Sequence, residues 1–401
     1  MARTLIRGGT VVDGRGGEPA AADVAFEDGR IVEVGPGLDG DEAVDAAGMT
    51  VLPGLFDCHV HVTMDGPDLL RSLGQPFSYQ FFRAAANLSA TLDCGITTVR
   101  DAGGADLGVK TAVDDGLVEG PRMQIAITIL SQTGGHNDQW VPSGCSLELV
   151  GGGHPGQPSP IVDGPEEMRR KVRELVRAGA DVIKVCTSGG VLSPRDDPRH
   201  PHFRDDELLV CVTEAAAADR FVMAHAQATD GIKAAIRTGI RSVEHGIFLD
   251  DEAIAMMLER GTWLVPTLVA PHAVLEAAAG GARVPPESLR KAEEVVGHHA
   301  DSFARAVAAG VRIAMGTDSG VGVHGTNLTE LELMAKGGMA PLEVWRATTS
   351  SAAELMGLGD ELGALEPGKR ADVVLLAGDP TDLGDLKARI RGVWKDGARL
   401  R

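Results

Sequence analysis

The feature that most constrains the fold is a regular alternation of short apolar runs with helix-like stretches between Asp57 and Met356. The eight runs are VLPGLFDCHVH, GITTVRDAG, RMQIAITIL, DVIKVCT, FVMAHA, RSVEHG, TWLVPTL and RIAMGTD. Several helix-like stretches end in glycine just before the next run, as suits a left-handed helix cap. These glycines are Gly95, Gly179, Gly239, Gly261 and Gly310. Eight strands alternating with helices predict an α/β fold, specifically a (β/α)8 TIM barrel, which needs about 250 residues.

An open, doubly wound parallel sheet is the alternative architecture. No GxGxxG follows the first run, which disfavours a dinucleotide-binding version of that sheet. Both chain ends differ from the middle, because they contain short strand-like runs separated by turns. The expected strands are Leu5–Arg7, Thr10–Val12, Asp23–Glu27, Arg30–Val34, Ala371–Leu376 and Ile390–Lys395. The two ends can complete one small β unit, since chain termini often lie close together.

Charge and cysteine content limit the partners and the compartment. A formal net charge of −19 argues against nucleic acids and anionic membrane surfaces, so we expect a small-molecule substrate. The five cysteines form no CxxC pair, which argues against a disulfide framework and favours a reducing compartment. The N-terminal segment does not resemble a signal peptide, and no apolar run reaches the ~18 residues of a membrane span. We therefore expect a cytoplasmic protein, and we also expect a homo-oligomer.

Potential metal ligands end five of the eight runs. His59 and His61 are two residues apart, so on a strand their side chains share one face. His225, His245 and Asp318 each end a later run. Such repeated placement is hard to explain by solvation alone. Imidazole and carboxylate groups suit zinc, manganese, iron, cobalt or nickel, and the residues do not choose among these metals.

Lys184 lies inside the run DVIKVCT, where a charged lysine is costly unless the charge is paired or removed. One interpretation is a lysine that extends its amine past the strand end toward water. The other is a lysine carboxylated by carbon dioxide, which becomes an anion able to bridge two metal ions. The residues alone leave both interpretations open.

Two long insertions follow predicted strands, at residues 131–164 and 188–204, so in a barrel both would lie on the face that carries active sites. In the first, His136 follows two glycines that permit close approach of a substrate. In the second, most polar residues are expected to be solvated, while Arg195 or His202 is expected to contact an anionic substrate. His324 is expected to line the pocket. We expect the remaining histidines His154, His298 and His299 at the surface.

The set of HxH, Lys, His, His and Asp at strand ends resembles the amidohydrolase superfamily. The resemblance includes PGLFDCHVH at Pro53–His61 and GALEPGKRADVVLL at Gly363–Leu376. It implies a metal-dependent hydrolase barrel at residues 57–365 and a small β-sandwich domain formed by residues 1–56 and 366–401. The branch most resembled contains metal-dependent prolidases, Xaa-Arg/Lys dipeptidases and ochratoxin-type amidases. The segments carrying that resemblance are TGGHND, SGGVLSPRDDP, HAQATDGIKAAIRTGIRSVEHG, GTDSG and HGTN.

The resemblance implies two divalent metal ions, with zinc expected. His59, His61 and Asp318 would hold one ion and His225 and His245 the other. Carboxylated Lys184 would bridge the two.

The implied function is hydrolysis of an amide (peptide) bond in dipeptides or N-acyl amino acids by metal-activated hydroxide. Asp318 would be the general base that passes a proton to the leaving amine. His136 would contact the substrate carboxylate or the reacting carbonyl. Gln227 departs from the family pattern, because many relatives have an aromatic residue there that helps hold the substrate carboxylate.

Three other functions stay open. One is hydrolysis of xenobiotic amides, carbamates or ureas, and another is deamination, because the loops choose the substrate on a shared metal site. A third is a scaffolding protein of this fold that has lost its metal. All six ligand positions are filled here, which argues against the scaffolding role.

Overall fold

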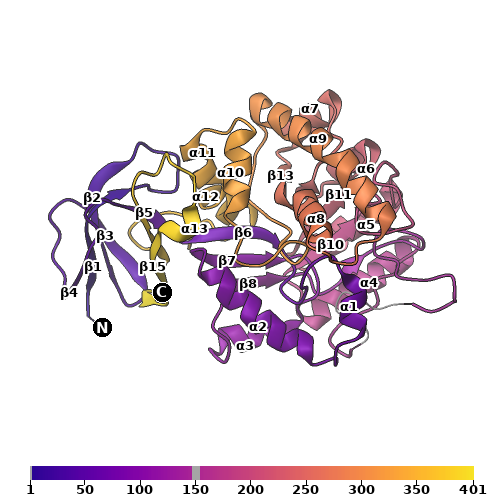
Figure 1. Ribbon diagram of the computed structural model, residues 1–401, viewed down its shortest axis with the longest axis horizontal. Coiled ribbons are helices and arrows are strands. Elements are labelled where there is room, and N and C mark those ends of the chain that lie inside the picture. Colours follow the sequence, from indigo (N-terminus) through magenta and orange to yellow (C-terminus); the bar gives the residue numbers. More distant parts are fainter. Residues whose placement is uncertain (1, 147–153) are drawn as a thin grey trace.

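The computed structural model describes residues 2–146 and 154–401, so part of the first insertion lies outside the described residues. A small sheet built from both chain ends lies at one side of a larger body of parallel strands and helices (Figure 1). No helix within the described ranges is long and apolar enough to cross a membrane.

The larger body contains two parallel sheets whose strands follow one another in chain order. The first sheet is β6 (Leu55–Val60), β7 (Ile96–Asp101) and β8 (Arg122–Ile125). The second is β9 (Ile129–Leu130), β10 (Val182–Cys186), β11 (Phe221–Ala226), β12 (Ser242–His245) and β13 (Trp263–Val265). Strands β6, β7, β10 and β12 are buried along their whole length, as expected for parallel strands covered on both faces.

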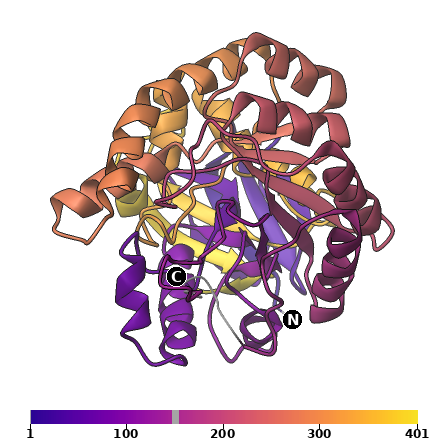
Figure 2. The same cartoon turned by 90° about the vertical axis from the view of Figure 1, so that its right-hand side faces the viewer.

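Helices lie around the outside of these strands (Figure 2). They are α1 (Leu69–Leu73), α2 (Tyr79–Leu92), α3 (Leu107–Asp114), α4 (Pro165–Ala178), α5 (Asp205–Ala216), α6 (Thr229–Thr238), α7 (Asp251–Arg260), α8 (Val269–Ala279), α9 (Pro286–Ala309), α10 (Thr329–Lys336), α11 (Pro341–Ala347) and α12 (Ser350–Leu355). The predicted glycine caps are confirmed at α4, α6, α7 and α9, which end in a left-handed glycine. Gly95 also has a positive φ of 74°, shortly after α2 ends.

The structure corrects three of the eight expected strands. The run RIAMGTD forms no regular strand, because Asp318 takes a left-handed φ of 59° and only isolated bridges flank it. Those bridges pair Leu264 with Ile313 and Val60 with Ser319, so this segment joins the outer strands of the two parallel sheets. The run RMQIAITIL is divided into β8 and β9 at Ile127, whose φ is 66°.

The first run is divided as well. Its beginning belongs to β5 (Met49–Pro53) of the small sheet, and its end forms β6. Gly54 separates the two strands, and a Cβ there would lie 2.2 Å from the Thr97 hydroxyl oxygen. The turn between the two sheets therefore requires glycine at this position.

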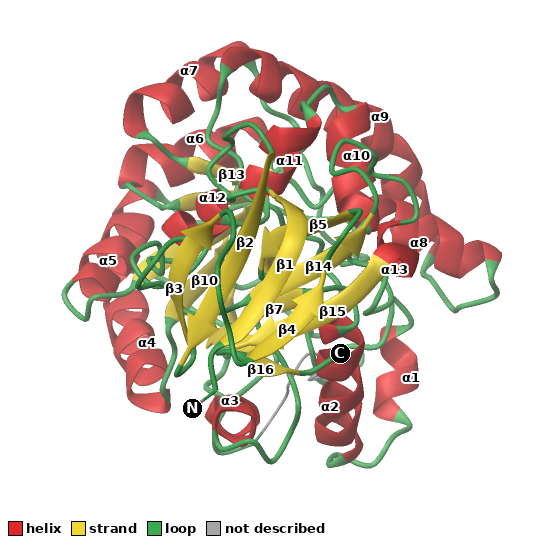
Figure 3. Cartoon of the chain, turned by 90° about the vertical axis from the view of Figure 1, so that its left-hand side faces the viewer, coloured by secondary structure: helices red, strands yellow, loops and turns green. Residues whose placement is uncertain are grey.

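The small sheet has eight strands, and Figure 3 shows them beside the ring of helices. They are β1 (Thr4–Val11), β2 (Ala20–Glu27), β3 (Arg30–Gly35), β4 (Glu42–Asp45), β5, β14 (Val373–Ala377), β15 (Ile390–Lys395) and β16 (Ala398–Arg399), with α13 (Leu386–Arg389) before β15. The two chain ends meet where β14 pairs antiparallel with β5. The two strands expected at Leu5–Arg7 and Thr10–Val12 are one strand with an irregular register between Ile6 and Gly9.

Buried side chains of this sheet form a core separate from that of the larger body. Its members include Phe26, Val51, Leu375 and Trp394. All eight strands of the small sheet are hydrogen-bonded into one continuous sheet. The domain boundaries at 56/57 and 365/366 stay a prediction.

Candidate active site

The six residues predicted as metal ligands all line one cavity of about 370 Å³. His59 is on β6, Lys184 on β10, His225 on β11 and His245 on β12. His61 directly follows β6, and Asp318 lies in the bridging segment, residues 312–319, whose isolated bridges reach β13 and β6. The site therefore lies toward the carboxyl ends of the parallel strands, with its six residues contributed by five backbone segments.

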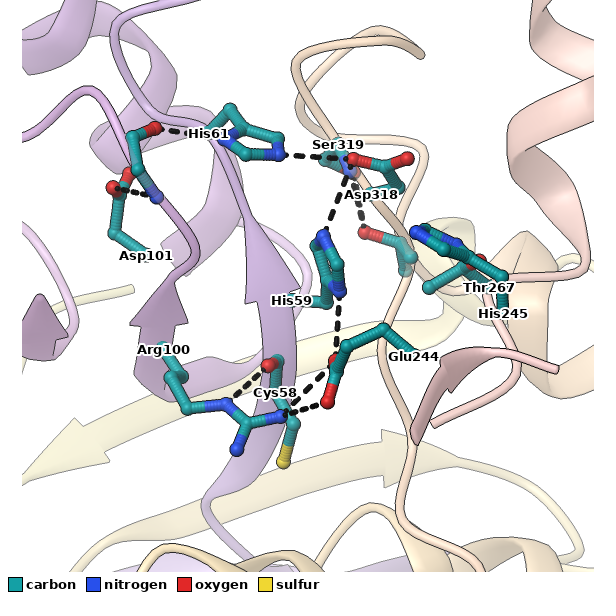
Figure 4. Close-up of polar contacts among 12 residues, drawn as sticks. Cys58, His59, His61, Arg100, Asp101, Glu244, His245, Thr267, Asp318 and Ser319 are labelled. Atoms are coloured by element: carbon teal, nitrogen blue, oxygen red, sulfur yellow. Dashed lines mark hydrogen bonds and ion pairs between the residues drawn. The ribbon is translucent and has the colours of Figure 1, made fainter. Parts of the chain in front are cut away.

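His59 and His61 converge on the same carboxylate oxygen (Figure 4). The distance from Asp318 Oδ1 is 3.5 Å to His59 Nε2 and 3.2 Å to His61 Nε2. The other ring nitrogen of each histidine is occupied. His59 Nδ1 donates to Glu244 Oε2 at 2.8 Å, and His61 Nδ1 donates to the Gly103 carbonyl at 2.7 Å. Each ring is thereby oriented, with Nε2 facing Asp318.

His225 and His245 are held in the same manner. His225 Nε2 donates to the Gly189 carbonyl at 3.0 Å, and His245 Nδ1 lies 2.7 Å from the Thr267 hydroxyl. The His245 ring centroid lies 4.7 Å from that of His225 and 5.1 Å from that of His59. All four imidazoles thus have one nitrogen engaged outside the site, which leaves the other to serve as a ligand.

Two buried polar atoms at the centre of this group lack a hydrogen-bond partner among the described residues. They are Lys184 Nζ and Asp318 Oδ1. A buried polar atom without a partner is costly, so such atoms call for an explanation such as an ion. Ligand atoms of His59, His245 and Asp318 all lie within 4.8 Å of one another, close enough to share a metal. The donor set therefore fits divalent metal ions.

The electrostatics agree with a metal-binding role. Burial lowers the pKa of His59, His225 and His245 well below the usual range, so these rings are neutral, as metal ligands must be. Burial also lowers the pKa of the Lys184 amine. At Asp318, burial opposes ionisation, but the attraction of His59 and His61 outweighs it and lowers the pKa. The centre thus combines neutral rings at His59, His225 and His245 with an ionised carboxylate. At His61, burial opposes the charge, but the attraction of Asp318 outweighs burial and raises the pKa.

A buried ion pair beneath His59 was not expected from the sequence. Arg100 Nη2 donates to both carboxylate oxygens of Glu244, at 3.0 and 3.1 Å, and Arg100 Nε donates to the Cys58 carbonyl. Ser242 also donates to Glu244. The signal was present, because Arg100 and Glu244 lie within fully buried strands, where a charge needs a partner. This pair fixes the carboxylate that orients His59.

Removal of the arginine provides a test of this ion pair. We expect Arg100→Leu to lower the free energy of unfolding of the metal-free protein by about 3–5 kcal/mol, because Glu244 is then buried with an unpaired charge. Denaturant unfolding followed by circular dichroism measures this change. Arg237→Leu, at an ion pair with Asp205 in which about half of each side chain is exposed, is the control and should change little. An Arg100→Leu loss no larger than the control loss would contradict the assignment.

A second buried carboxylate ties β6 to the segment that carries Asp318. Asp57 accepts hydrogen bonds from the Thr317 hydroxyl at 2.6 Å, from Asn327 Nδ2 at 2.8 Å and from the His59 backbone. Burial raises the pKa of Asp57 to about 6 despite these bonds. Sequence reasoning did not single out this residue. Its contacts hold together the ends of the first and last segments of the site.

The predicted substrate contacts divide into two groups. His136, Arg195 and Gln227 line the cavity. His202 and His324 are buried and are not among the described residues that line it. His324 Nδ1 lies 3.3 Å from the Thr91 hydroxyl, and His324 Nε2 donates to the His61 carbonyl at 3.2 Å. His324 therefore supports the backbone of His61, one of the predicted metal ligands.

One expectation about the remaining histidines is wrong. His299 is buried and not at the surface. Its Nε2 lies 3.0 Å from the His245 carbonyl and 2.8 Å from the Pro266 carbonyl, and the residue lines the cavity. It occupies the inner face of α9, whose periodicity places it toward the strands.

The rest of the cavity wall is mostly apolar. Its apolar side chains come from the segment after β6, helix α1, the second insertion, the loop after β12, helix α8 and the loop after Asp318. They include Met64, Leu70, Val191, Leu192, Ile247, Pro271, Val274 and Val321. The cavity therefore suits a ligand with a sizeable apolar part next to the polar centre.

Comparisons with known proteins agree with this geometry. The Amidohydrolase family profile matches residues 50–400. Ochratoxinase from Aspergillus niger is 37% identical over 366 residues, which cover 86% of this chain and 75% of that protein. A solved Xaa-Pro dipeptidase with methionine bound in its active site has a TM-score of 0.90 and 32% identity over 99% of both chains.

A solved prolidase in complex with N-methylphosphonate-L-proline is also similar, with a TM-score of 0.92 and 36% identity. The similarity covers 100% of this chain and 99% of the prolidase. Molinate hydrolase, at 23% identity, shares the fold. The family match over most of the chain, the ochratoxinase and the dipeptidase together show that the chain belongs to the amidohydrolase family and is a hydrolase acting on C–N bonds.

Proposed function

We propose that the chain is a binuclear metal-dependent amidohydrolase that releases an amino acid from dipeptides or N-acyl amino acids. In this proposal the two parallel sheets and the bridging segment act as one (β/α)8 barrel, with the small sheet as a separate domain. The observation that carries it is the cavity itself, in which four oriented imidazoles surround a lysine amine and a carboxylate oxygen that lack hydrogen-bond partners among the described residues.

His59, His61 and Asp318 would hold one metal ion, and His225 and His245 the other. When bound, the ions, for which we propose zinc, would activate water and polarise the amide carbonyl. Asp318 would accept the proton of the attacking water and deliver it to the leaving nitrogen. The low pKa of its carboxylate supports the first part of this role, because the group is ionised and ready to accept a proton.

Lys184 would serve as a carbamate. A neutral amine attacks carbon dioxide, an N–C bond forms, and one proton is released. The lowered pKa of Lys184 favours the neutral amine that this reaction needs. The product is an anion, which would replace the neutral amine and would supply oxygen donors for the metal ions. The absence of a hydrogen-bond partner for Nζ among the described residues supports this role.

The substrate class follows from the cavity wall and from the relatives. Arg195 can attract a substrate carboxylate, and the apolar side chains can hold the acyl part. Gln227 is buried in the wall, and its Oε1 has no hydrogen-bond partner in the described part of the chain. The Gln227 amide can bind a polar group of the substrate at the position where many relatives have an aromatic residue. This wall favours N-acyl amino acids and dipeptides with a bulky apolar N-terminal part.

A substrate screen tests this function. We expect the metal-loaded protein to release free amino acids from a library of dipeptides and N-acyl amino acids, and we expect chelation to abolish the release. Chromatography of the products measures the reaction, and elemental analysis should find about two metal ions per chain. The chelated protein reloaded with zinc is the control and should regain activity. Turnover of carbamates, ureas or amino-substituted heterocycles without any amide cleavage would overturn the proposed substrate class.

A further inference from the structure

The second insertion contains a buried carboxylate that the sequence predicts to be a solvated loop residue. Asp196 has a side chain only 3% exposed. It accepts from His136 Nδ1 at 2.9 Å, from Lys291 Nζ at 3.0 Å and from the Gly190 backbone N–H at 3.1 Å. Burial opposes its charge, but His136 and Lys291 outweigh that effect and lower the pKa of Asp196 to about 2. Asp196 is therefore an ionised hydrogen-bond acceptor.

The acceptor fixes the position of the proton on His136. An ionised carboxylate can only accept, so His136 Nδ1 must carry a hydrogen. The structure records no hydrogen bond between His136 Nε2 and the described residues, and the ring lines the cavity. In the neutral ring, Nε2 is thus the nitrogen left for a substrate.

The ring plane is fixed by two further contacts. His136 stacks on His225 with ring centroids 4.2 Å apart and an interplanar angle of 13°. On another side it lies against Gly190, where an added Cβ would come within 2.3 Å of His136 Cε1. Lys291 of α9 completes the arrangement, because its Nζ also donates to the Gly190 carbonyl at 3.0 Å and the Ser193 carbonyl at 2.7 Å. Lys291 therefore fastens two things to α9. One is the loop at Gly190 and Ser193 that lies against the His136 ring, and the other is the Asp196 carboxylate that accepts from that ring.

From this arrangement we infer that Asp196, anchored by Lys291, is a positioning residue that sets the tautomer and orientation of His136 for contact with the substrate. The inference rests on the proposed function, because the position of His136 matters only if the ring meets a substrate.

A double-mutant cycle on turnover tests the inference. We expect Asp196→Asn to lower kcat/KM for the best amide substrate by about 10–100-fold with metal content unchanged. In a His136→Ala background the same substitution should cost less than about twofold, because Asp196 acts through the absent ring. Asp197→Asn is the matched control, since this half-exposed neighbour accepts a hydrogen bond from the Arg199 backbone and lies 3.8 Å from the Arg199 guanidinium, and the activity of this variant should stay unchanged.

A loss of the same size in both backgrounds would show that Asp196 only anchors the loop, and it would overturn the inference. If Asp196→Asn does not fold, Lys291→Met takes its place in the cycle. Its loss should likewise disappear in the His136→Ala background, and equal losses in both backgrounds would overturn the inference.

A spectroscopic readout separates this inference from the proposed function. Long-range proton–nitrogen spectra of histidine-labelled protein at alkaline pH report which ring nitrogen carries the proton. The His136→Ala variant identifies the signal. We expect the Nδ1–H form in the unsubstituted protein and a shift toward Nε2–H in Asp196→Asn, because an asparagine amide can donate to Nδ1. An Nε2–H form in the unsubstituted protein overturns the inference. The expected tautomer in a protein without amidase activity would overturn only the function.

Discussion

Replacing Asp318 with asparagine is expected to lower kcat by about 10²–10⁴-fold, because the amide can neither accept the proton of the attacking water nor return it to the leaving amine. Most of the metal should remain bound, since His59, His61, His225 and His245 are unchanged and oriented by their own partners. Steady-state kinetics with elemental analysis of the same sample measures both quantities.

The matched control is Asp301→Asn, at an exposed carboxylate on α9. It should leave both turnover and metal content unchanged. Full activity of Asp318→Asn at full metal occupancy would remove Asp318 from the base role. Loss of both metal and activity would mean that its contribution is as a ligand and not as a base.

Replacing Lys184 with alanine is expected to remove most of the bound metal and with it the activity. The substitution deletes the proposed bridging anion and leaves the imidazoles to hold the ions alone. Short-chain carboxylic acids should restore part of the bound metal and part of the activity, because a carboxylate small enough to enter the cavity can occupy the place of the carbamate. Metal analysis and turnover, each with and without added acetate or propionate, measure the rescue.

Lys336→Ala, at an exposed lysine in the last turn of α10, should behave like the unsubstituted protein. Carbon-13 spectra of protein equilibrated with labelled bicarbonate should show a carbamate signal that is absent from Lys184→Ala. A fully active, metal-loaded enzyme without that signal would rule out the bridging role. Lys184 would then be an unmodified lysine whose pKa is lowered by burial.

The sequence could bring the six candidate ligands together in one cavity because all of them except Lys184 lie at the end of an apolar segment. A strand end is a local feature, so His225 and His245 could be placed from a few flanking residues. The buried pair of Arg100 and Glu244 could have been found by the reasoning that singled out Lys184, since each is a charge inside an apolar strand.

The network around Asp196 offered no such local signal. Its partners His136 and Lys291 lie 60 and 95 residues away in the sequence. The loop is rich in proline, arginine and aspartate, a composition typical of solvated segments. Only tertiary packing removes Asp196 from water. The left-handed backbone at Asp318 was missed for a similar reason, because contacts of the neighbouring Thr317 with Asp57 hold this bend, and the bend itself falls on an aspartate between Gly316 and Gly320.

The pairing of β14 with β5 has a consequence for synthesis on the ribosome. β5 leads directly into β6, and β6 carries His59. The hydrogen-bonding edge of β5 that β14 occupies stays unpaired until residues 373–377 have been translated, while β6 to β13 are made earlier. An unpaired strand edge on a nascent chain is open to mispairing and aggregation. During translation, the need of the nascent chain for chaperones should therefore depend more on this unpaired edge of β5 than on strands β6 to β13.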